Sequence, residues 1–207
     1  ELDNKVETIL RNKNIKYKLF KGNVLNEYNS ITKNDGTPFK VFSPFWRHAE
    51  QIYLDKVPPK ENKIKKLNKK LSIFNSKNKP KDLLPKYDWY KKFESYWNVS
   101  EKDSHNELQN FLKERILKYS NDRDFPSLNG SSKLSPYIRN GQLNVNKIWK
   151  SCSSIKNKNI GVRKYLNELG WREFSHSLIN YFPEMLKGNL RKEFDKFPWE
   201  KNNKFLN

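Results

Sequence analysis

The sequence has a single cysteine, Cys152, and only three histidines, His48, His105 and His176. One cysteine excludes a disulfide framework and a cysteine-based metal site, and it fits a reducing cytosol, so we expect a cytoplasmic protein. No histidine has another histidine at the spacing that metal sites use, and we therefore predict no metal. No apolar run reaches about 18 residues, so we expect no transmembrane helix and no membrane partner.

Motifs of several common enzyme classes are also missing. The chain has no Gly-x-x-x-x-Gly-Lys and no Gly-x-Gly-x-x-Gly phosphate loop. It has no Gly-x-Ser-x-Gly, and Cys152 lies between serines with no histidine near it in the sequence. The sequence thus lacks the motifs that usually indicate nucleotide triphosphate hydrolysis or serine or cysteine hydrolase chemistry.

Apolar residues are few but aromatic residues are not. The apolar share is 35% and the mean hydropathy is −1.02, whereas aromatic residues make up 14%. Disordered chains are poor in aromatic residues, so we expect a folded protein. The first residue is Glu1, not Met, and no basic-then-apolar leader follows it. With the small apolar share, this start suggests an internal fragment of a longer protein.

The charge balance is strongly basic, with 42 Lys and Arg against 23 Asp and Glu, a formal charge of +19. Such an excess attracts polyanions, nucleic acid first and anionic membranes second. Only eight of the 42 basic residues are Arg, and Asn and Ile are also frequent, a pattern expected from AT-rich coding DNA. The excess of lysines can therefore equally result from base composition, with the lysines spread over solvated faces. The total charge alone does not predict nucleic-acid binding, which requires a specific motif.

The N-terminal part combines one helical and two extended patterns. Residues 4–12 have helical apolar spacing. Residues 15–20 alternate apolar and basic side chains, and residues 39–42 follow the turn at 34–36, so both predict strands. A complete doubly wound domain needs more strands than that. Residues 1–50 are therefore predicted to be the C-terminal end of an α/β (Rossmann-like) domain.

Residues 51–103 are rich in lysine and interrupted by proline. This composition indicates an interdomain linker that runs over the surface, with short ordered pieces at residues 71–74 and 89–97. A dedicated DNA-binding arm is the alternative interpretation.

From residue 104 to residue 207 the pattern is helical. Ser104 opens a capping box with the glutamate three residues later. Ser135 and Asn144 are expected helix starts, and a long helix is expected over 160–181, where Phe182 and Pro183 stop it. The predicted fold class is mostly α, with an all-α second half.

Two stretches could bind a ligand. Residues 129–139 combine a glycine turn, three hydroxyls, a cation and a helix start, which suits a phosphate; a simple capped turn is the alternative. In the expected long helix, Glu168, Trp171, Arg172 and Ser175 fall on one face. That face suits a nucleobase, since an indole stacks and a carboxylate accepts from ring N–H groups. A half-buried tryptophan beside a surface ion pair is the alternative.

Five segments, in order along the chain, are similar to the DNA photolyase/cryptochrome family. They are Gly36–Phe45 against G-x-P-Y-x-V-F-T-P-F, Tyr119–Pro126 against Y-x-x-x-R-D-x-P, Ser131–Tyr137 against T-S-x-L-S-P-Y, Asn167–Phe174 against N-E-L-I-W-R-E-F, and Phe194–Asn202, which in the family leads to a key tryptophan. Each string alone is weak, whereas five in the right order are specific. The chain is most similar to a class I cyclobutane pyrimidine dimer photolyase, as an internal fragment.

The resemblance implies that residues 104–207 are the N-terminal part of the helical FAD-binding domain. It also implies that FAD is the cofactor, and that the full-length protein could carry an antenna chromophore, methenyltetrahydrofolate or deazaflavin. The positions that match flavin contacts of the family are Tyr119, Ser131, Ser132, Lys133, Leu134, Ser135 and Tyr165. Tyr165 stands where the family usually has a flavin-contacting tryptophan.

The resemblance further implies UV-damaged DNA as the partner of a monomeric, light-driven repair enzyme. Glu168 would hydrogen-bond a flipped pyrimidine dimer, and Trp171 would stack on it. Trp199 matches the outermost tryptophan of the electron-transfer chain. The positions that map to the DNA side are Arg123, Glu168, Trp171, Arg172 and Ser175. Glu168 favours a cyclobutane-specific enzyme over a (6-4) photolyase, and a cryptochrome-type blue-light photoreceptor is the alternative from another class.

The sequence departs from the family pattern at three of these positions. Lys133 replaces a frequent Arg, and Ser175 replaces an aromatic residue. Gly170 stands where a branched apolar residue is usual, which is about 1 kcal/mol less favourable in a helix. The chain also stops before the family's remaining flavin contacts and its two inner electron-transfer tryptophans. We therefore predict that this chain by itself neither holds FAD tightly nor repairs DNA.

Overall fold

The computed structural model describes residues 2–18, 24–27, 30–54, 85–156 and 159–198. These residues are mostly helical and include no strand, in agreement with the predicted predominance of α structure. No helix among them is long and apolar enough to cross a membrane. The contacts divide the chain into two compact units, Glu1–Tyr53 with Gly170–Asn207, and Leu54–Leu169. This division by contacts does not coincide with the predicted boundaries at residues 50 and 103.

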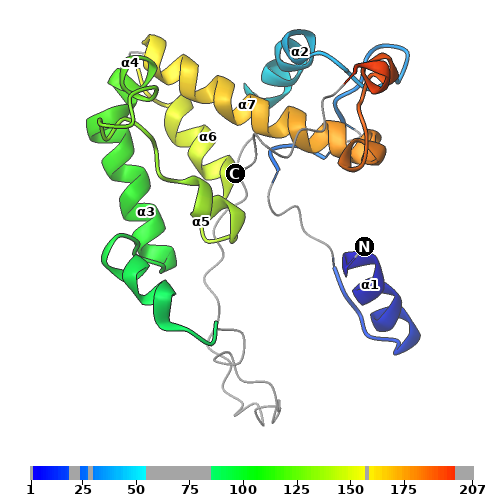
Figure 1. Ribbon diagram of the computed structural model, residues 1–207, viewed down its shortest axis with the longest axis horizontal. Coiled ribbons are helices and arrows are strands. Elements are labelled where there is room, and N and C mark those ends of the chain that lie inside the picture. Colours follow the sequence, from blue (N-terminus) through cyan, green and yellow to red (C-terminus); the bar gives the residue numbers. More distant parts are fainter. Residues whose placement is uncertain (1, 19–23, 28–29, 55–84, 157–158, 199–207) are drawn as a thin grey trace. The chain divides into compact units, whose positions relative to one another are not determined.

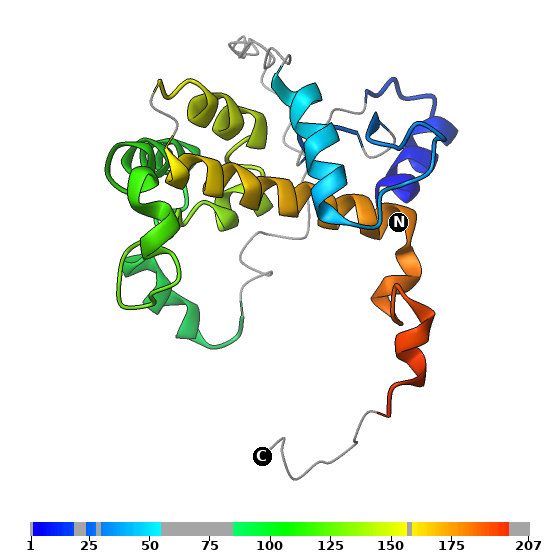
Figure 2. The ribbon, with the colours of Figure 1, turned by 90° about the horizontal axis from the view of Figure 1, so that it is seen from above.

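The first unit contains two helices before the boundary at Tyr53, and its later elements come from the C-terminal part of the chain. Its described elements are α1 (Leu2–Asn12), α2 (Phe42–Leu54), the second half of α7 (Ile160–Tyr181), and the 3-10 helices η6 (Pro183–Leu186) and η7 (Lys192–Lys196). Helix α1 confirms the helix expected over residues 4–12. Helix α2 lies beside the second half of α7 in both views (Figures 1 and 2).

Both strand predictions are wrong for the residues that the structure describes. Residues 15–18 have no regular structure, and Phe42 is the first residue of α2 instead of the last residue of a strand. Pro44 fits the first helical turn because no intrahelical partner is needed for its missing N–H. The apolar residues continue at helical spacing through Trp46 to Tyr53, which are 6% and 2% exposed. This longer period determines the structure, and it outweighs the short alternation of residues 39–42.

The second unit is a cluster of short helices that pack around the first half of α7 (Figure 1). Its described elements are η3 (Asp88–Ser95), α3 (Glu101–Asn110), the π-helical turn η4 (Phe111–Arg115), η5 (Ile116–Lys118), α4 (Tyr119–Asp122), α5 (Ser135–Arg139) and α6 (Val145–Ser153). The residues that fill its core with less than 2% exposure are Ser104, Leu108, Phe111, Ile116, Leu134, Leu143, Val145, Ile148, Cys152 and Val162. The 3-10 helix η3 overlaps the piece expected at 89–97, whereas residues 71–74 lie outside the described residues.

The structure confirms one of the predicted helix caps and contradicts another. Asn144 caps α6, since its side chain accepts a hydrogen bond from the N–H of Asn146 at 2.8 Å. The predicted capping role of Ser104 is wrong, because α3 begins one turn earlier and Ser100 accepts from the N–H of Asp103. Ser104 is instead fully buried, with its hydroxyl 3.0 Å from the carbonyl oxygen of Gln142. A hydroxyl with this partner ties α3 to the segment before α6.

Gly170 is the point of closest approach between α7 and α2. A Cβ atom at this position would lie 2.5 Å from the indole ring of Trp46. The glycine that looks unfavourable from helix propensity is therefore required by packing. The departure from the family pattern at Gly170 has a steric reason in the first unit.

The substitution Gly170→Ala tests this contact. We expect it to lower the free energy of unfolding by about 1 to 3 kcal/mol, because overpacking outweighs the better helix propensity of alanine. Chemical denaturation followed by circular dichroism measures the change. In the control Gly188→Ala the new Cβ meets its nearest atom at 3.6 Å, and we expect no loss. A Gly170→Ala chain as stable as the original would contradict the packing argument.

Candidate functional site

The predicted phosphate loop lies in the second unit, between α4 and α5. Gly130 is buried, and a Cβ there would lie 2.4 Å from the carbonyl group of Asp122, so only glycine lets the loop press onto α4. Leu134 is fully buried and anchors the other end. Between them the side chains of Ser131 and Lys133 are exposed. The loop thus presents a hydroxyl and a cation to the surface, which fits the phosphate end of a dinucleotide such as FAD.

Lys133 holds this loop in an unusual backbone conformation. Its φ angle is +56°, in the left-handed region that non-glycine residues seldom adopt. Ser135, which sequence analysis placed as a helix cap, is the first residue of α5 and is exposed. The Ser132 hydroxyl lies 3.3 Å from the N–H of Leu134, which turns the chain into α5.

Tyr119 and Tyr165 form an aromatic cluster with Phe111. The Tyr165 ring lies 4.6 Å from the Phe111 ring and 5.2 Å from the Tyr119 ring, measured between centroids. Burial raises the pKa of both tyrosines, and a hydrogen bond with Ser132 opposes part of this shift at Tyr165. Two neutral tyrosines and the serine of the loop therefore lie together, while their role as flavin contacts stays a prediction.

Arg123 and Glu168 form an ion pair in the same unit. Arg123 Nη1 contacts Glu168 Oε1, and the guanidinium also lies 5.3 Å from the centre of the Tyr119 ring. Burial is the largest single influence and lowers the pKa of Arg123, but the hydrogen bond to Glu168 and the charges of Glu168, Asp124 and Tyr119 together outweigh it, so the pKa of Arg123 is raised. Two residues that sequence analysis placed separately on the DNA side are thus brought into direct contact. Their side chains remain 25% and 30% exposed, which leaves Glu168 accessible to a ligand.

Trp171 belongs to an aromatic stack in the first unit. Its ring lies 3.7 Å from the Phe42 ring at an interplanar angle of 11°, and Phe42 is in turn stacked towards Trp46. Trp171 is still 47% exposed. Because Phe42 covers one face of the indole, a nucleobase could stack on the opposite face only. Ser175, which is exposed, donates to the Trp171 carbonyl oxygen at 2.9 Å.

Arg172 is held by a residue that sequence analysis did not single out. Arg172 Nη1 donates to Glu173 Oε1 at 2.8 Å. Glu173 is 4% exposed and follows Leu166 and Leu169 on the apolar side of α7. The sequence signal that could have identified Glu173 is a carboxylate at a position that helical spacing assigns to the apolar side.

Trp199 lies outside the described residues. In the part of the chain that the structure describes, no group of three or more His, Cys, Asp or Glu side chains could hold a metal ion. Burial raises the pKa of the Cys152 thiol to about 12, which makes it a packing residue and not a nucleophile.

Comparisons with known proteins all lead to one family. The family model for DNA photolyase matches residues 1–63. The deoxyribodipyrimidine photo-lyase of Agrobacterium fabrum is 28% identical over 98% of this chain and 43% of its own length. That of Alkalihalophilus pseudofirmus is 27% identical over 95% of this chain and 41% of its own length.

A solved structure agrees with these sequence matches. The crystal structure of a bacterial class III photolyase from Agrobacterium tumefaciens superposes with a TM-score of 0.78 and 26% identity. It covers 99% of this chain and 43% of that protein. The chain therefore spans less than half the length of the relatives it matches. The resemblance found in the sequence is confirmed, and the assignment to class I within the family stays a prediction.

A double-mutant cycle tests the pair of Arg123 and Glu168. We expect Arg123→Gln, Glu168→Gln and their combination to give a coupling energy of about 1 kcal/mol in denaturation experiments, as for a partly buried pair. The exposed pair of Lys91 and Asp88, whose side chains are 58% and 67% exposed, is the matched control and should give less than about 0.5 kcal/mol. Equal coupling in the two cycles would mean that Arg123 does not hold Glu168 in solution.

Proposed function

We propose, from the homology of nearly the whole chain to DNA photolyases, that it is part of a flavin-dependent, light-driven enzyme that repairs DNA. Its substrate in this proposal is a cyclobutane pyrimidine dimer flipped out of UV-damaged duplex DNA. The proposal is carried by one observation, the clustering of Tyr119, Ser132 and Tyr165 beside an exposed hydroxyl-rich loop. That clustering is what the family pattern requires of flavin-binding residues.

The domain assignment is part of the same proposal. Residues 104–207 would be the first part of the helical FAD-binding domain, and residues 51–103 the linker before it. Residues 1–50 would be the end of an α/β domain, represented among the described residues by helices alone. In the full-length protein an antenna chromophore could bind to the remainder of that α/β domain.

FAD would be held by the loop and by the tyrosines beneath it. The exposed Ser131 and Lys133 would bind the phosphates, while Leu134 fixes the loop from inside and Ser135 starts the following helix. Bound FAD would supply the light-driven electron that opens the dimer ring and is afterwards returned. The residues of the chain contribute binding, orientation and exclusion of water, and in the family pattern Trp199 would relay electrons from outside.

The lesion would be recognised by side chains of α7. Trp171 would stack on the flipped dimer with the ring face opposite to Phe42. Glu168, oriented by Arg123, would accept hydrogen bonds from the N–H groups of the pyrimidine rings. Flipping the lesion requires a few kcal/mol, which is least for an already damaged base pair. Arg172 and Ser175 would lie near the backbone phosphates, where contacts add affinity without sequence preference.

Binding of a duplex with one thymine dimer tests the lesion site. We expect Glu168→Gln and Trp171→Ala each to weaken binding of the damaged duplex about tenfold, since stacking or a charged hydrogen bond contributes about 1 to 3 kcal/mol. Affinity for the undamaged duplex should change little. Fluorescence anisotropy measures both duplexes. Trp89→Ala, which removes a 58% exposed indole of η3, is the matched control. Unchanged preference for damaged DNA in both variants would contradict the site.

Flavin content and repair test the extent of the site in this chain. We expect the purified chain to contain far less than stoichiometric FAD and to repair no dimers in light, because it would supply only part of the cavity. Flavin absorbance and loss of dimers from an irradiated oligonucleotide measure these properties. A yellow, fully loaded and active preparation would overturn the expectation. A full-length parent that binds and photoreduces FAD but leaves dimers intact would favour the cryptochrome-type photoreceptor.

A further inference from the structure

The carboxylate of Glu173 joins three parts of the first unit. Its Oε2 atom accepts a hydrogen bond from the N–H of Leu25 at 2.8 Å, and its Oε1 atom accepts from Arg172 at 2.8 Å. The N–H of Asn26 also donates to this carboxylate. The side chain is only 3% exposed. One buried carboxylate therefore fixes the segment at Leu25 and Asn26 to α7, and it holds the guanidinium of Arg172.

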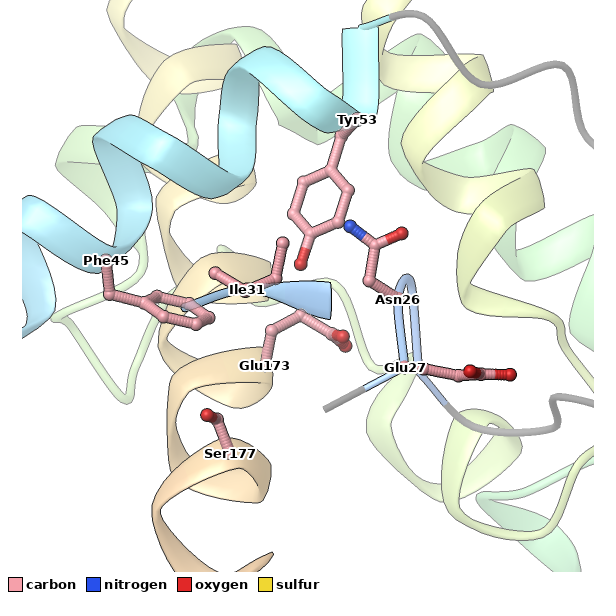
Figure 3. A pocket seen from close by; sticks show the side chains of 7 residues that line it. All are labelled: Asn26, Glu27, Ile31, Phe45, Tyr53, Glu173 and Ser177. Carbon is pink, nitrogen blue, oxygen red and sulfur yellow. The ribbon is translucent and has the colours of Figure 1, made fainter. Parts of the chain in front are cut away.

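A small cavity of about 10 Å³ lies beside this carboxylate (Figure 3). Asn26 lines it and is 3% exposed, and its side-chain amide lies beside the Tyr53 hydroxyl (Figure 3), with which it interacts. A buried amide has more hydrogen-bonding positions than one hydroxyl can fill. The volume is near the lower limit for holding one water molecule. A water, or a proton on Glu173, would supply a further donor in the same cavity.

Few other charged or titratable groups face Glu173. Arg172 contacts it from α7, and the buried Tyr53 faces it from α2 and acts on it electrostatically. Glu27, from the segment that contains Asn26, lines the cavity with its carboxylate turned away (Figure 3). Burial raises the pKa of Glu173 to about 7, although the N–H of Leu25 and the charge of Arg172 oppose the shift.

We propose that Glu173 and Asn26 form a proton-binding site that switches the hold on Arg172. When Glu173 is ionised, its charge pairs with the guanidinium. When a proton from solvent binds a carboxylate oxygen, the ion pair loses its negative partner and the guanidinium becomes free to bind another anion. The meaning for DNA rests on the proposed function, in which Arg172 lies near the backbone phosphates. Glu173 is then a positioning residue for Arg172.

Titration of Glu173 in the isotope-labelled chain tests the proton site without DNA. We expect one glutamate carboxyl signal with a midpoint near pH 7, and we expect it to be absent from Glu173→Gln. The Arg172 guanidinium N–H signals should be protected from solvent exchange above the midpoint and lose that protection below it. A Glu173 midpoint near the ordinary 4.5 would overturn the proposal, as would Arg172 signals that do not change.

Two further variants keep the test decisive if Glu173→Gln folds poorly. Arg172→Gln removes the favourable charge at a partly exposed position and should raise the midpoint by about one pH unit. Glu27→Gln removes the other carboxylate of the cavity and should leave the midpoint unchanged. A midpoint that moves with Glu27 and not with Arg172 would overturn the assignment.

The free energy of unfolding should decrease as the pH rises, because of the raised pKa of Glu173. The pKa of Glu173 is higher in the folded chain than the 4.5 of an exposed carboxyl. The carboxyl therefore contributes stability that is fully present below the unfolded value and is lost as the pH rises through about 7. Between these limits the unfolding free energy should fall more steeply with pH in the original chain than in Glu173→Gln.

Binding of an undamaged duplex tests the consequence for Arg172. We expect affinity to be about tenfold higher on the acidic side of the midpoint than on the alkaline side, as expected for one freed charged contact. Glu173→Gln should keep the high affinity at alkaline pH. Because both chains contain the same histidines, comparing their pH dependences removes the contribution of histidine titration. If Glu173 titrates as expected but the chain binds no DNA, the proposed function is contradicted and the proton site is still supported. Equal pH dependence in both chains would overturn the switch.

Discussion

Close approach of neighbouring groups to α7 at two glycines, a tryptophan ring at one and backbone at the other, is the constraint on which the rest of this structure depends. In the first unit Gly170 admits the indole of Trp46, whose ring would lie 2.5 Å from any Cβ. In the second unit Gly161 admits the carbonyl oxygen of Ile116, which would lie 2.3 Å from a Cβ. Asn159 completes this second contact by donating to the Leu117 carbonyl oxygen at 2.8 Å. Each unit is thus assembled on its own half of one helix, and each half carries the glycine that its neighbour needs.

The helical parts of the fold were predictable from the sequence because their signals are local. Asn144 caps α6 through its own side chain, and α7 ends at Tyr181, just before the Phe182 and Pro183 pair that stops it. The two strands were wrong because four to six alternating residues contain little information. Residues 39–42 run into the longer helical period of α2, and residues 15–18 have no regular structure. The cap at Ser104 failed for a local reason, since Ser100 caps α3 one turn earlier. The Ser104 hydroxyl lies 2.6 Å from the Glu101 carbonyl oxygen and 3.0 Å from that of Gln142.

The candidate site was predictable in its parts, whereas the contacts between the parts were not. The loop at Ser131–Ser135 and the residues of α7 follow from motif and helical spacing. The pairing of Arg123 with Glu168 and the stacking of Phe42 on Trp171 join residues 45 and 129 positions apart, and no local pattern encodes such contacts. Glu173 was missed because a carboxylate beside an arginine is typical of a solvated helix face, and only burial gives it another meaning.

The two arginine–carboxylate pairs of α7 show why the total charge says little about function. The +19 of the chain is spread mainly over lysines, while Arg172 is paired with Glu173, and Arg123 with Glu168 and the more exposed Asp124. The pair of Glu168 is about one third exposed, so salt in the solvent screens it and a ligand can reach it. The pair of Glu173 is enclosed on its acidic side, so salt screens it less and protons control it instead. Burial, not the number of charges, therefore distinguishes the two pairs: Glu168 stays within reach of a ligand, as the proposed function requires, whereas Glu173 is sheltered from solvent, as the proposed proton site requires.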